Sequence, residues 1–188
     1  MSRPDVLVIL GPTASGKSGL ALRLARWLRG RGQAAEIVNA DSMLVYRGMD
    51  IGTAKPTLAE RAEIPHHLVD IMDIAETASA AEFQRLARAA IADCQARGAV
   101  PLVVGGSALY LRAVTDRFDF PASDPAVRAR LETELADLGV AALYERLRTA
   151  APAAAAGISP LNARRVVRAL EAVETTGAFR STLPGWDY

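Results

Sequence analysis

Apolar and polar positions follow two alternating periodicities at the start of the chain. The apolar run from Val6 to Leu10 predicts a buried strand over 5–10, and apolar residues at near-helical spacing predict a helix over 17–30. A second apolar run predicts another strand over 35–40. This order of strand, helix and strand is typical of a parallel α/β sheet.

The same alternation continues to residue 115. After a long loop over 41–56, we expect a polar helix near 57–62 and a short edge strand within 65–73. Ser79 and Glu82 have the spacing of a capping box, which predicts a helix over 79–97 that ends at Gly98. A strand over 100–104 and a helix after Ser107 complete an α/β core over 1–115.

The pattern changes after Asp116. Helices are predicted over 124–138, 140–150 and 160–176, with turns at Gly139 and over 151–157, and no strand is predicted between them. The small residues of 150–157 are expected to form a connection between helices. We therefore predict an all-helical lobe over 116–180 that is inserted into the core, with 181–188 starting the return of the chain to the sheet.

Charge and composition exclude several classes of protein. A net charge of +1 gives no overall field for nucleic acid, so such a contact would need a local patch. The single cysteine, Cys94, excludes a disulfide framework and is expected to be a buried apolar residue. The sequence has no apolar stretch suited to a signal peptide or a membrane span, which predicts a cytoplasmic protein without membrane association. We also expect a monomer.

The strongest motif is GPTASGKS, which matches G-x-x-x-x-G-K-[ST] between a predicted strand and a predicted helix. Backbone N–H groups at this helix start, Lys17 and a Mg²⁺ ion on Ser18 would bind phosphate oxygens. The fold class is therefore α/β, a parallel sheet core like that of P-loop NTPases with an inserted all-helical lobe. The predicted phosphate-binding residues are Gly11, Pro12, Thr13, Ala14, Ser15, Gly16, Lys17 and Ser18.

Other residues extend this prediction. Lys17 and Lys55 are the two lysines among 22 basic residues, and both are expected to place an ammonium against phosphate. Asp41 and Asp70 are the candidate carboxylates near the carboxyl edge of the sheet, where such sheets bind ligands. His66 and His67 lack metal-ligand spacing with Cys94 or an acidic cluster, so no zinc site is predicted.

The motifs taken together resemble the tRNA dimethylallyltransferase family. GPTASGKS, DSMLVYRGMDIGTAKP, HHLVDI, VVGGSALY and RRVVRALE occur in the order and spacing of that family along essentially the whole chain. The resemblance implies that the loop binds dimethylallyl diphosphate, whose pyrophosphate leaves, and that the acceptor is the N6 amine of the adenosine 3′ to the anticodon in tRNA. Thr13 is then expected to assist the leaving group, and Asp41 to act as the base.

The resemblance also implies a set of contacts with the anticodon stem-loop of tRNA. Asp41, Ser42, Met43 and Leu44 would hold the extruded adenine. Ser107 is expected to approach the tRNA, as are the basic residues Arg128, Arg164, Arg165 and Arg168. Leu44 stands where the family usually has Gln, and Ala108 stands where it usually has Gly.

Other functions stay open on the sequence alone. One is prenylation of free AMP, ADP or ATP, and another is a P-loop kinase for a small metabolite. A third is a diphosphate-binding fragment without turnover, because family members are expected to be longer and to carry a pyrophosphate-binding arginine in the additional part. For Arg128, Arg165 and Arg168, a solvated basic face is the alternative interpretation.

Overall fold

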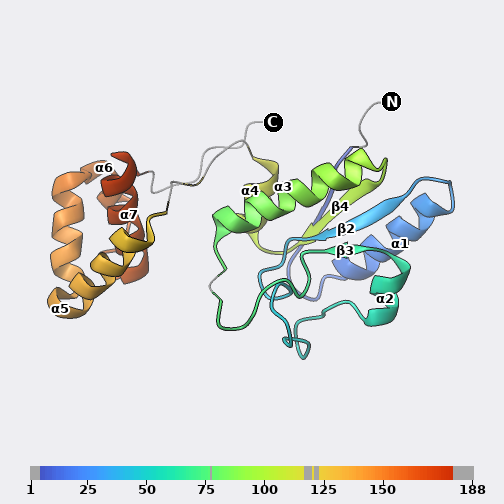
Figure 1. Ribbon diagram of the computed structural model, residues 1–188, viewed down its shortest axis with the longest axis horizontal. Helices are drawn as coiled ribbons and strands as arrows, with labels where there is room; N and C mark the ends of the chain where they lie inside the picture. Colours follow the sequence, from blue (N-terminus) through green and yellow to red (C-terminus); the bar gives the residue numbers. More distant parts are fainter. Residues whose placement is uncertain (1–4, 77, 117–119, 121–122, 180–188) are drawn as a thin grey trace. The chain divides into compact units, whose positions relative to one another are not determined.

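Figure 1 shows the computed structural model of the chain, which describes residues 5–76, 78–116, 120 and 123–179. The chain divides into two compact units, Met1–Arg117 and Phe118–Tyr188. The elements of the first unit are β1 (Leu7–Leu10), α1 (Lys17–Arg29), β2 (Ala35–Asn39), α2 (Leu58–Glu63), β3 (His66–His67), α3 (Ala80–Ala96), β4 (Val100–Gly105) and α4 (Ala108–Thr115).

The four strands form one parallel sheet in the order β1-β4-β2-β3, which confirms the predicted parallel α/β core. Leu102 of β4 is paired with Leu7 on one side and with Ile37 on the other. Since all strands run the same way, their carboxyl ends lie at one edge of the sheet. The loops that follow β1, β2 and β4 therefore meet at that edge.

Alternate residues of the central strands pack against different helices. Ile37 and Leu102 belong to the apolar cluster that includes α1, whereas Val38 and Val103 belong to the cluster that includes α3. Because successive side chains of a strand point to opposite faces, α1 and α3 cover opposite faces of the sheet. Two separate groups of polar residues lie on these two faces.

The second unit is helical over its described residues, 120 and 123–179. It contains α5 (Pro125–Ala150), α6 (Pro152–Ala156) and α7 (Ala163–Thr176). Gly139 interrupts α5 with φ 77° and ψ 165°, so the two helices predicted on either side of it are confirmed. The segment predicted as a bare connection contains α6 instead, because Pro152 suits the first helical position and alanines favour a helix.

A buried apolar cluster holds this helical unit together. It joins Leu131, Leu143 and Leu147 of α5 to Val166 and Leu170 of α7. Across the ranges that the structure describes, no helix is long and apolar enough to span a bilayer. The expectation that the chain returns to the sheet concerns 181–188, which lie outside the described residues.

Candidate active site

The loop between β1 and α1 has the backbone form of an anion-binding site. Ala14 and Gly16 adopt left-handed conformations, with φ of 64° and 80°, and such turns point successive N–H groups to one side. The N-cap of α1 is Gly16, which has no side chain to cap the first N–H groups of the helix. The helix dipole adds to the preference for an anion at this end.

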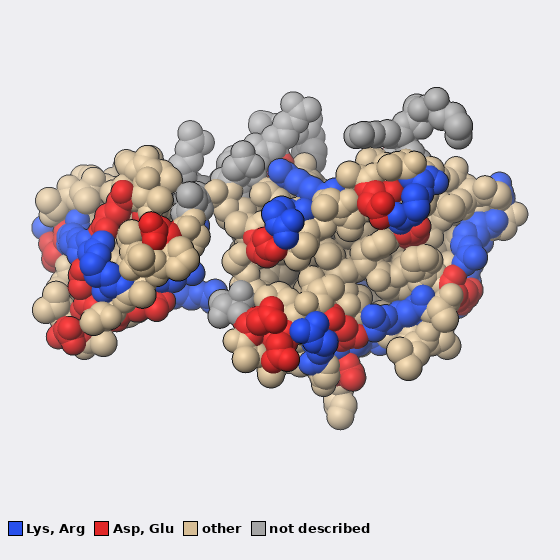
Figure 2. Space-filling model, viewed as in Figure 1, with Lys and Arg blue, Asp and Glu red and all other residues tan. Residues whose placement is uncertain are grey.

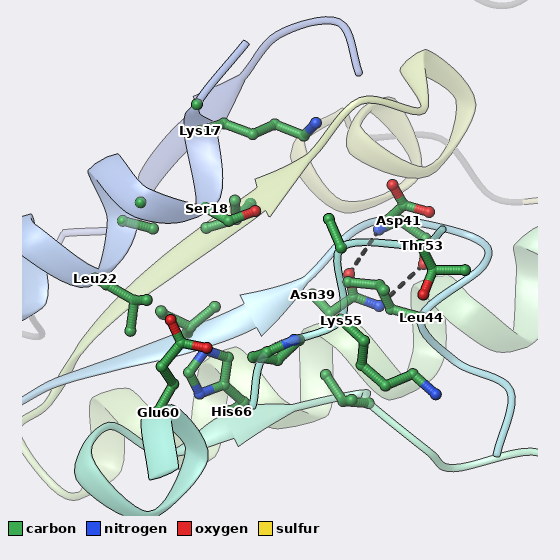
Figure 3. Close-up of a pocket in the computed structure, with 18 of the residues that line it drawn as sticks. Lys17, Ser18, Leu22, Asn39, Asp41, Leu44, Thr53, Lys55, Glu60 and His66 are labelled. Carbon is green, nitrogen blue, oxygen red and sulfur yellow. Dashed lines mark hydrogen bonds between the residues drawn. The ribbon is translucent and has the colours of Figure 1, made fainter. Parts of the chain in front are cut away.

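A cavity of about 360 Å³ opens between this loop and the segment that follows β2. Lys17 and Ser18 lie on one side of it, and Asp41 and Thr53 lie on the other, as Figure 3 shows. Of the residues predicted from the sequence, those in its walls are Thr13, Ala14, Gly16, Lys17, Ser18, Asp41 and Leu44. The predicted residues Gly11, Pro12, Ser15, Ser42, Met43 and Ser107 do not line it.

Asp41 is held by a tight turn directly after β2. The buried side chain of Asn39 fixes this turn, since its Oδ1 accepts from Asp41 N at 2.9 Å and its Nδ2 donates to Leu68 O at 2.9 Å. Asp41 Oδ1 accepts a hydrogen bond from Met43 N at 2.9 Å. The carboxylate thus caps the turn and, at the same time, faces the cavity (Figure 3).

Lys55 lines the cavity, but its ammonium binds acceptors of the protein, so its predicted contact with phosphate stays a prediction. Its ammonium donates to Tyr46 O at 2.8 Å, Asp50 Oδ1 at 2.6 Å and Asp70 Oδ1 at 2.6 Å. These three acceptors use all three donors of a lysine. Figure 3 shows the ammonium of Lys55 pointing away from Lys17.

Asp70 is also committed to the protein, which removes it as a candidate magnesium ligand. Besides Lys55, it accepts from Arg61 Nη1 at 2.5 Å. Partial burial raises the pKa of Asp70, but the hydrogen bonds from Lys55 and Arg61 outweigh burial and hold this pKa below its usual value. For Lys55, burial lowers the pKa, and the two carboxylates more than reverse that effect.

Several wall residues were not identified from the sequence: Asn39, Thr53, Glu60, His66 and Val69. His66 lies next to Ile37 in the register of β3 on β2, and both side chains line the cavity. Its Nδ1 is 2.7 Å from Ile64 O, and burial lowers its pKa. The sequence did contain a signal for His66. Neighbouring residues of a strand face opposite sides of a sheet, so one of the two adjacent histidines on the predicted edge strand had to face the side on which the cavity lies.

The predicted tRNA-binding arginines divide into two pairs in the helical unit. Arg128 and Arg168 donate to the buried carboxylate of Glu171 at 2.7 and 2.8 Å. The pair with Arg128 links α5 to α7, whereas the pair with Arg168 lies within α7. Arg164 and Arg165 are exposed at the start of α7. On the face shown in Figure 2, acidic and basic side chains are interspersed, and neither unit shows an extended surface of one sign there.

Comparisons with known proteins agree with the predicted resemblance. The sequence profile of the IPP transferase family matches residues 44–185. The chain is 62% identical over 180 residues to the tRNA dimethylallyltransferase of Salinispora arenicola, an alignment that covers 95% of this chain and 51% of that protein. It is 56% identical over 188 residues to that of Nocardioides sp., covering 100% of this chain and 59% of the relative.

Solved structures give the same result. The tRNA isopentenylpyrophosphate transferase of Bacillus halodurans has 44% sequence identity and a TM-score of 0.57, with 94% of this chain and 57% of that one covered. A eukaryotic dimethylallyltransferase acting on tRNA has 34% identity and a TM-score of 0.78, with 93% and 42% covered. The chain therefore spans between about half and three fifths of the length of these curated relatives.

Proposed function

Because the chain belongs to the IPP transferase family, we propose that it transfers a dimethylallyl group from dimethylallyl diphosphate to N6 of the adenosine 3′ to the anticodon in tRNA. One observation carries this proposal: the carboxylate of Asp41 faces Lys17 and Ser18 across a single cavity (Figure 3). This arrangement supports the proposal, because it would let a leaving group at the phosphate loop and an amine beside Asp41 meet in one cavity. The expected monomeric state and cytoplasmic location stay predictions.

The phosphate loop serves the leaving group. The allylic C–O bond breaks while its electron pair passes to the bridging oxygen of the diphosphate. Gly16 and Lys17 line the cavity, and the N–H groups around Gly16 and the ammonium of Lys17 would bind the oxygens that gain this charge. Thr13, in the same wall, is the hydroxyl that we assign to the bridging oxygen.

The other wall serves the acceptor. A new bond forms between N6 and the allylic carbon, and the proton that N6 loses passes to the carboxylate of Asp41. Asn39 and the Met43 N–H fix the position of this carboxylate, so it needs no reorientation when the base arrives. Adenine must leave the anticodon stack to enter the cavity, and Leu44 and Thr53 form the wall beside Asp41 against which it would pack.

Mg²⁺ is the cofactor that we assign to this reaction. Ser18 offers an exposed hydroxyl in the first turn of α1 that lines the cavity, which fits an ion that prefers oxygen ligands and keeps several waters. When bound, Mg²⁺ supplies positive charge to the diphosphate oxygens. Exposed Arg164 and Arg165 are the residues that we assign to contacts with the phosphates of tRNA.

The experiment incubates the purified chain with labelled dimethylallyl diphosphate, Mg²⁺ and unmodified anticodon stem-loop RNA. Parallel reactions contain AMP or ATP in place of RNA. We expect label in RNA alone, and we expect Asp41→Asn to lower the transfer rate by about 10²–10⁴-fold with unchanged binding of the diphosphate. Asp137→Asn, an exposed carboxylate on α5, is the matched control and should leave the rate unchanged.

Three outcomes would contradict the proposal. Label transferred to AMP or ATP would make the chain an adenylate prenyltransferase. ATP hydrolysis without prenyl transfer would favour a kinase. Binding of the diphosphate without transfer, in the presence of saturating RNA, would leave the chain as a diphosphate-binding unit.

A further inference from the structure

A second group of polar residues lies on the α3 face of the sheet. It joins Glu36 of β2, His67 of β3 and Cys94 of α3, whose donor atoms all lie within 4.8 Å of one another. His67 Nε2 is 2.6 Å from Glu36 Oε2, and Cys94 Sγ is 3.4 Å from Glu36 Oε2 and 3.5 Å from His67 Nε2. A carboxylate, an imidazole and a thiol therefore converge on one point.

This group is separate from the cavity of the candidate active site. Ile37 and His66 line that cavity, whereas their neighbours Glu36 and His67 point to the other face of the sheet. Cys94 is fully buried in the apolar cluster beneath α3. All three ligand candidates sit on paired strands or a long helix, which hold them more firmly than a loop would.

The spacing is close to that of a zinc site. In a tetrahedral zinc site, N and O ligands lie about 2.0 Å from the metal and an S ligand lies about 2.3 Å from it. On this geometry an N and an O ligand are about 3.3 Å apart, and the S ligand is about 3.5 Å from either of them. The two separations from Cys94 Sγ, 3.4 and 3.5 Å, already match. Among the three candidate ligands, only the contact between Glu36 and His67 must open, by about 0.7 Å on this geometry.

Among the described residues, Arg97 is the cation whose charge would disfavour a metal ion bound by Glu36, His67 and Cys94. Its Nη2 donates to Glu36 Oε2 at 2.8 Å, and its other end is paired with Asp93. The side chain of Arg97 is 46% exposed, so it can release Glu36 and keep Asp93.

We propose that Glu36, His67 and Cys94 form a mononuclear binding site for a zinc-class divalent transition metal. Glu36 Oε2, His67 Nε2 and Cys94 Sγ are the three protein ligands, and a water fills the fourth position. On binding, the S–H bond of Cys94 breaks, the proton passes to solvent, and a bond from Sγ to the metal forms without any change of oxidation state. With three ligands fixed by the fold, the ion adds a cross-link between β2, β3 and α3.

The test titrates Co²⁺ into the tag-free chain and follows the near-ultraviolet absorption. Cys94 is the single cysteine of the sequence, so a thiolate-to-Co²⁺ charge-transfer band reports this site alone. We expect a band that saturates at one equivalent, is removed by Zn²⁺, and is accompanied by a higher Tm. Mg²⁺ at the phosphate loop would give neither the band nor competition for it.

Variants test each ligand. Cys94→Ser should abolish the band. His67→Gln should weaken Co²⁺ binding by more than about 100-fold, because mutation of a residue that only hydrogen-bonds to a metal ligand already lowers metal affinity by about 10–100-fold. His66→Gln, the neighbouring histidine on the opposite face, is the matched control and should leave the Co²⁺ affinity unchanged. Arg97→Gln should strengthen binding by about fivefold, because a nearby like charge is removed.

The proposal is overturned if saturating Co²⁺ produces no thiolate band in the folded chain. It is also overturned if His66→Gln and His67→Gln weaken binding equally, or if Arg97→Gln weakens it. Far-UV circular dichroism of each variant shows whether it is folded. Glu36→Gln, which keeps the size of the side chain, provides a second ligand deletion if Cys94→Ser is unfolded.

Discussion

Lys55 Nζ lies 2.6 Å from Asp70 Oδ1, and this ion pair ties the loop after β2 to the chain that follows β3. The side chain of Lys55 is only 5% exposed. The same loop carries Leu44 and Thr53, which line the cavity. The buried ammonium of Lys55 therefore fixes the wall that faces the phosphate loop.

Replacing Lys55 by Met should lower the free energy of unfolding by about 1–3 kcal/mol, because two carboxylates and a carbonyl lose their donor while Arg61 still pairs with Asp70. Urea denaturation measures this change. Arg26→Gln removes a comparable but exposed ion pair with Glu63 and should cost much less stability than Lys55→Met. Equal losses in the two variants would show that burial of Lys55 contributes nothing.

The helical unit should lose stability in acid because of Glu171. Burial raises the pKa of this carboxyl, but hydrogen bonds from Arg128, Arg168 and Ser123 prevail and lower it from 4.5 to about 2. Since the folded pKa is the lower one, the stabilisation is complete above about pH 5 and is lost as the pH falls toward 2. It amounts to about 3 kcal/mol.

Glu171→Gln should therefore destabilise α5 and α7 at pH 7 and flatten the dependence of stability on pH between about 5 and 2. Urea denaturation at a series of pH values, followed by circular dichroism, measures both effects. Glu145→Gln is the control, because Glu145 forms only an exposed pair with Arg148. An unchanged slope below pH 5 in Glu171→Gln would contradict the assignment.

Two glycines should respond in opposite ways to the same substitution. A Cβ on Gly105 would lie 2.2 Å from Ala40 O, where the ends of β4 and β2 approach each other, so Gly105→Ala should destabilise the first unit by about 1–3 kcal/mol or more. A Cβ on Gly19 in α1 would meet only the flexible end of Arg23. Gly19→Ala should raise Tm, since alanine is the better helix former. Thermal unfolding distinguishes the two.

Leu44 tests the recognition of adenine. Leu44 lines the cavity beside Asp41, at the position where the resemblance to the family implies Gln. If the proposed function holds, Leu44→Gln adds an amide that can pair with the base edge and should raise kcat/KM for stem-loop RNA about fivefold. Leu44→Met, which adds no hydrogen-bonding group, should leave it unchanged. A similar rise with Met would indicate that packing, not hydrogen bonding, limits the reaction.

Two arginines of the helical unit, Arg164 on α7 and Arg128 on α5, should separate binding of RNA from stability. Arg164→Ala is expected to weaken the binding of stem-loop RNA with no loss of stability. The slope of the logarithm of the binding constant against the logarithm of the salt concentration should become smaller by about 1, because one phosphate contact is lost. Arg128→Ala should instead destabilise the unit, because Glu171 loses a buried partner. Fluorescence anisotropy at several salt concentrations, together with denaturation, measures both properties. A loss of stability in Arg164→Ala would contradict the assignment of Arg164 to RNA binding and not to the stability of the helical unit.

Local pattern was sufficient for most of the secondary structure and for the phosphate loop. Helix α3 begins after Ser79, whose side chain accepts from Glu82 N at 3.1 Å, as the capping spacing predicted. The helix after GPTASGKS was confirmed as α1, and the strand before it is β1. The predicted burial of that strand is wrong, because β1 lies at the edge of the sheet and Leu7, Val8 and Leu10 are exposed. Such features depend on residues only a few positions apart, which is why the sequence alone could predict them.

The tertiary structure alone decided which distant polar groups meet. Lys55 and Asp70 are 15 residues apart, Arg128 and Glu171 are 43 apart, and Cys94 and Glu36 are 58 apart. Their partners follow from strand register and helix packing, and a shift of one residue in β3 would exchange His66 and His67 between the two faces of the sheet. Composition and spacing determined which chemical groups the chain carries, whereas packing determined which of them became binding walls and which became internal ion pairs.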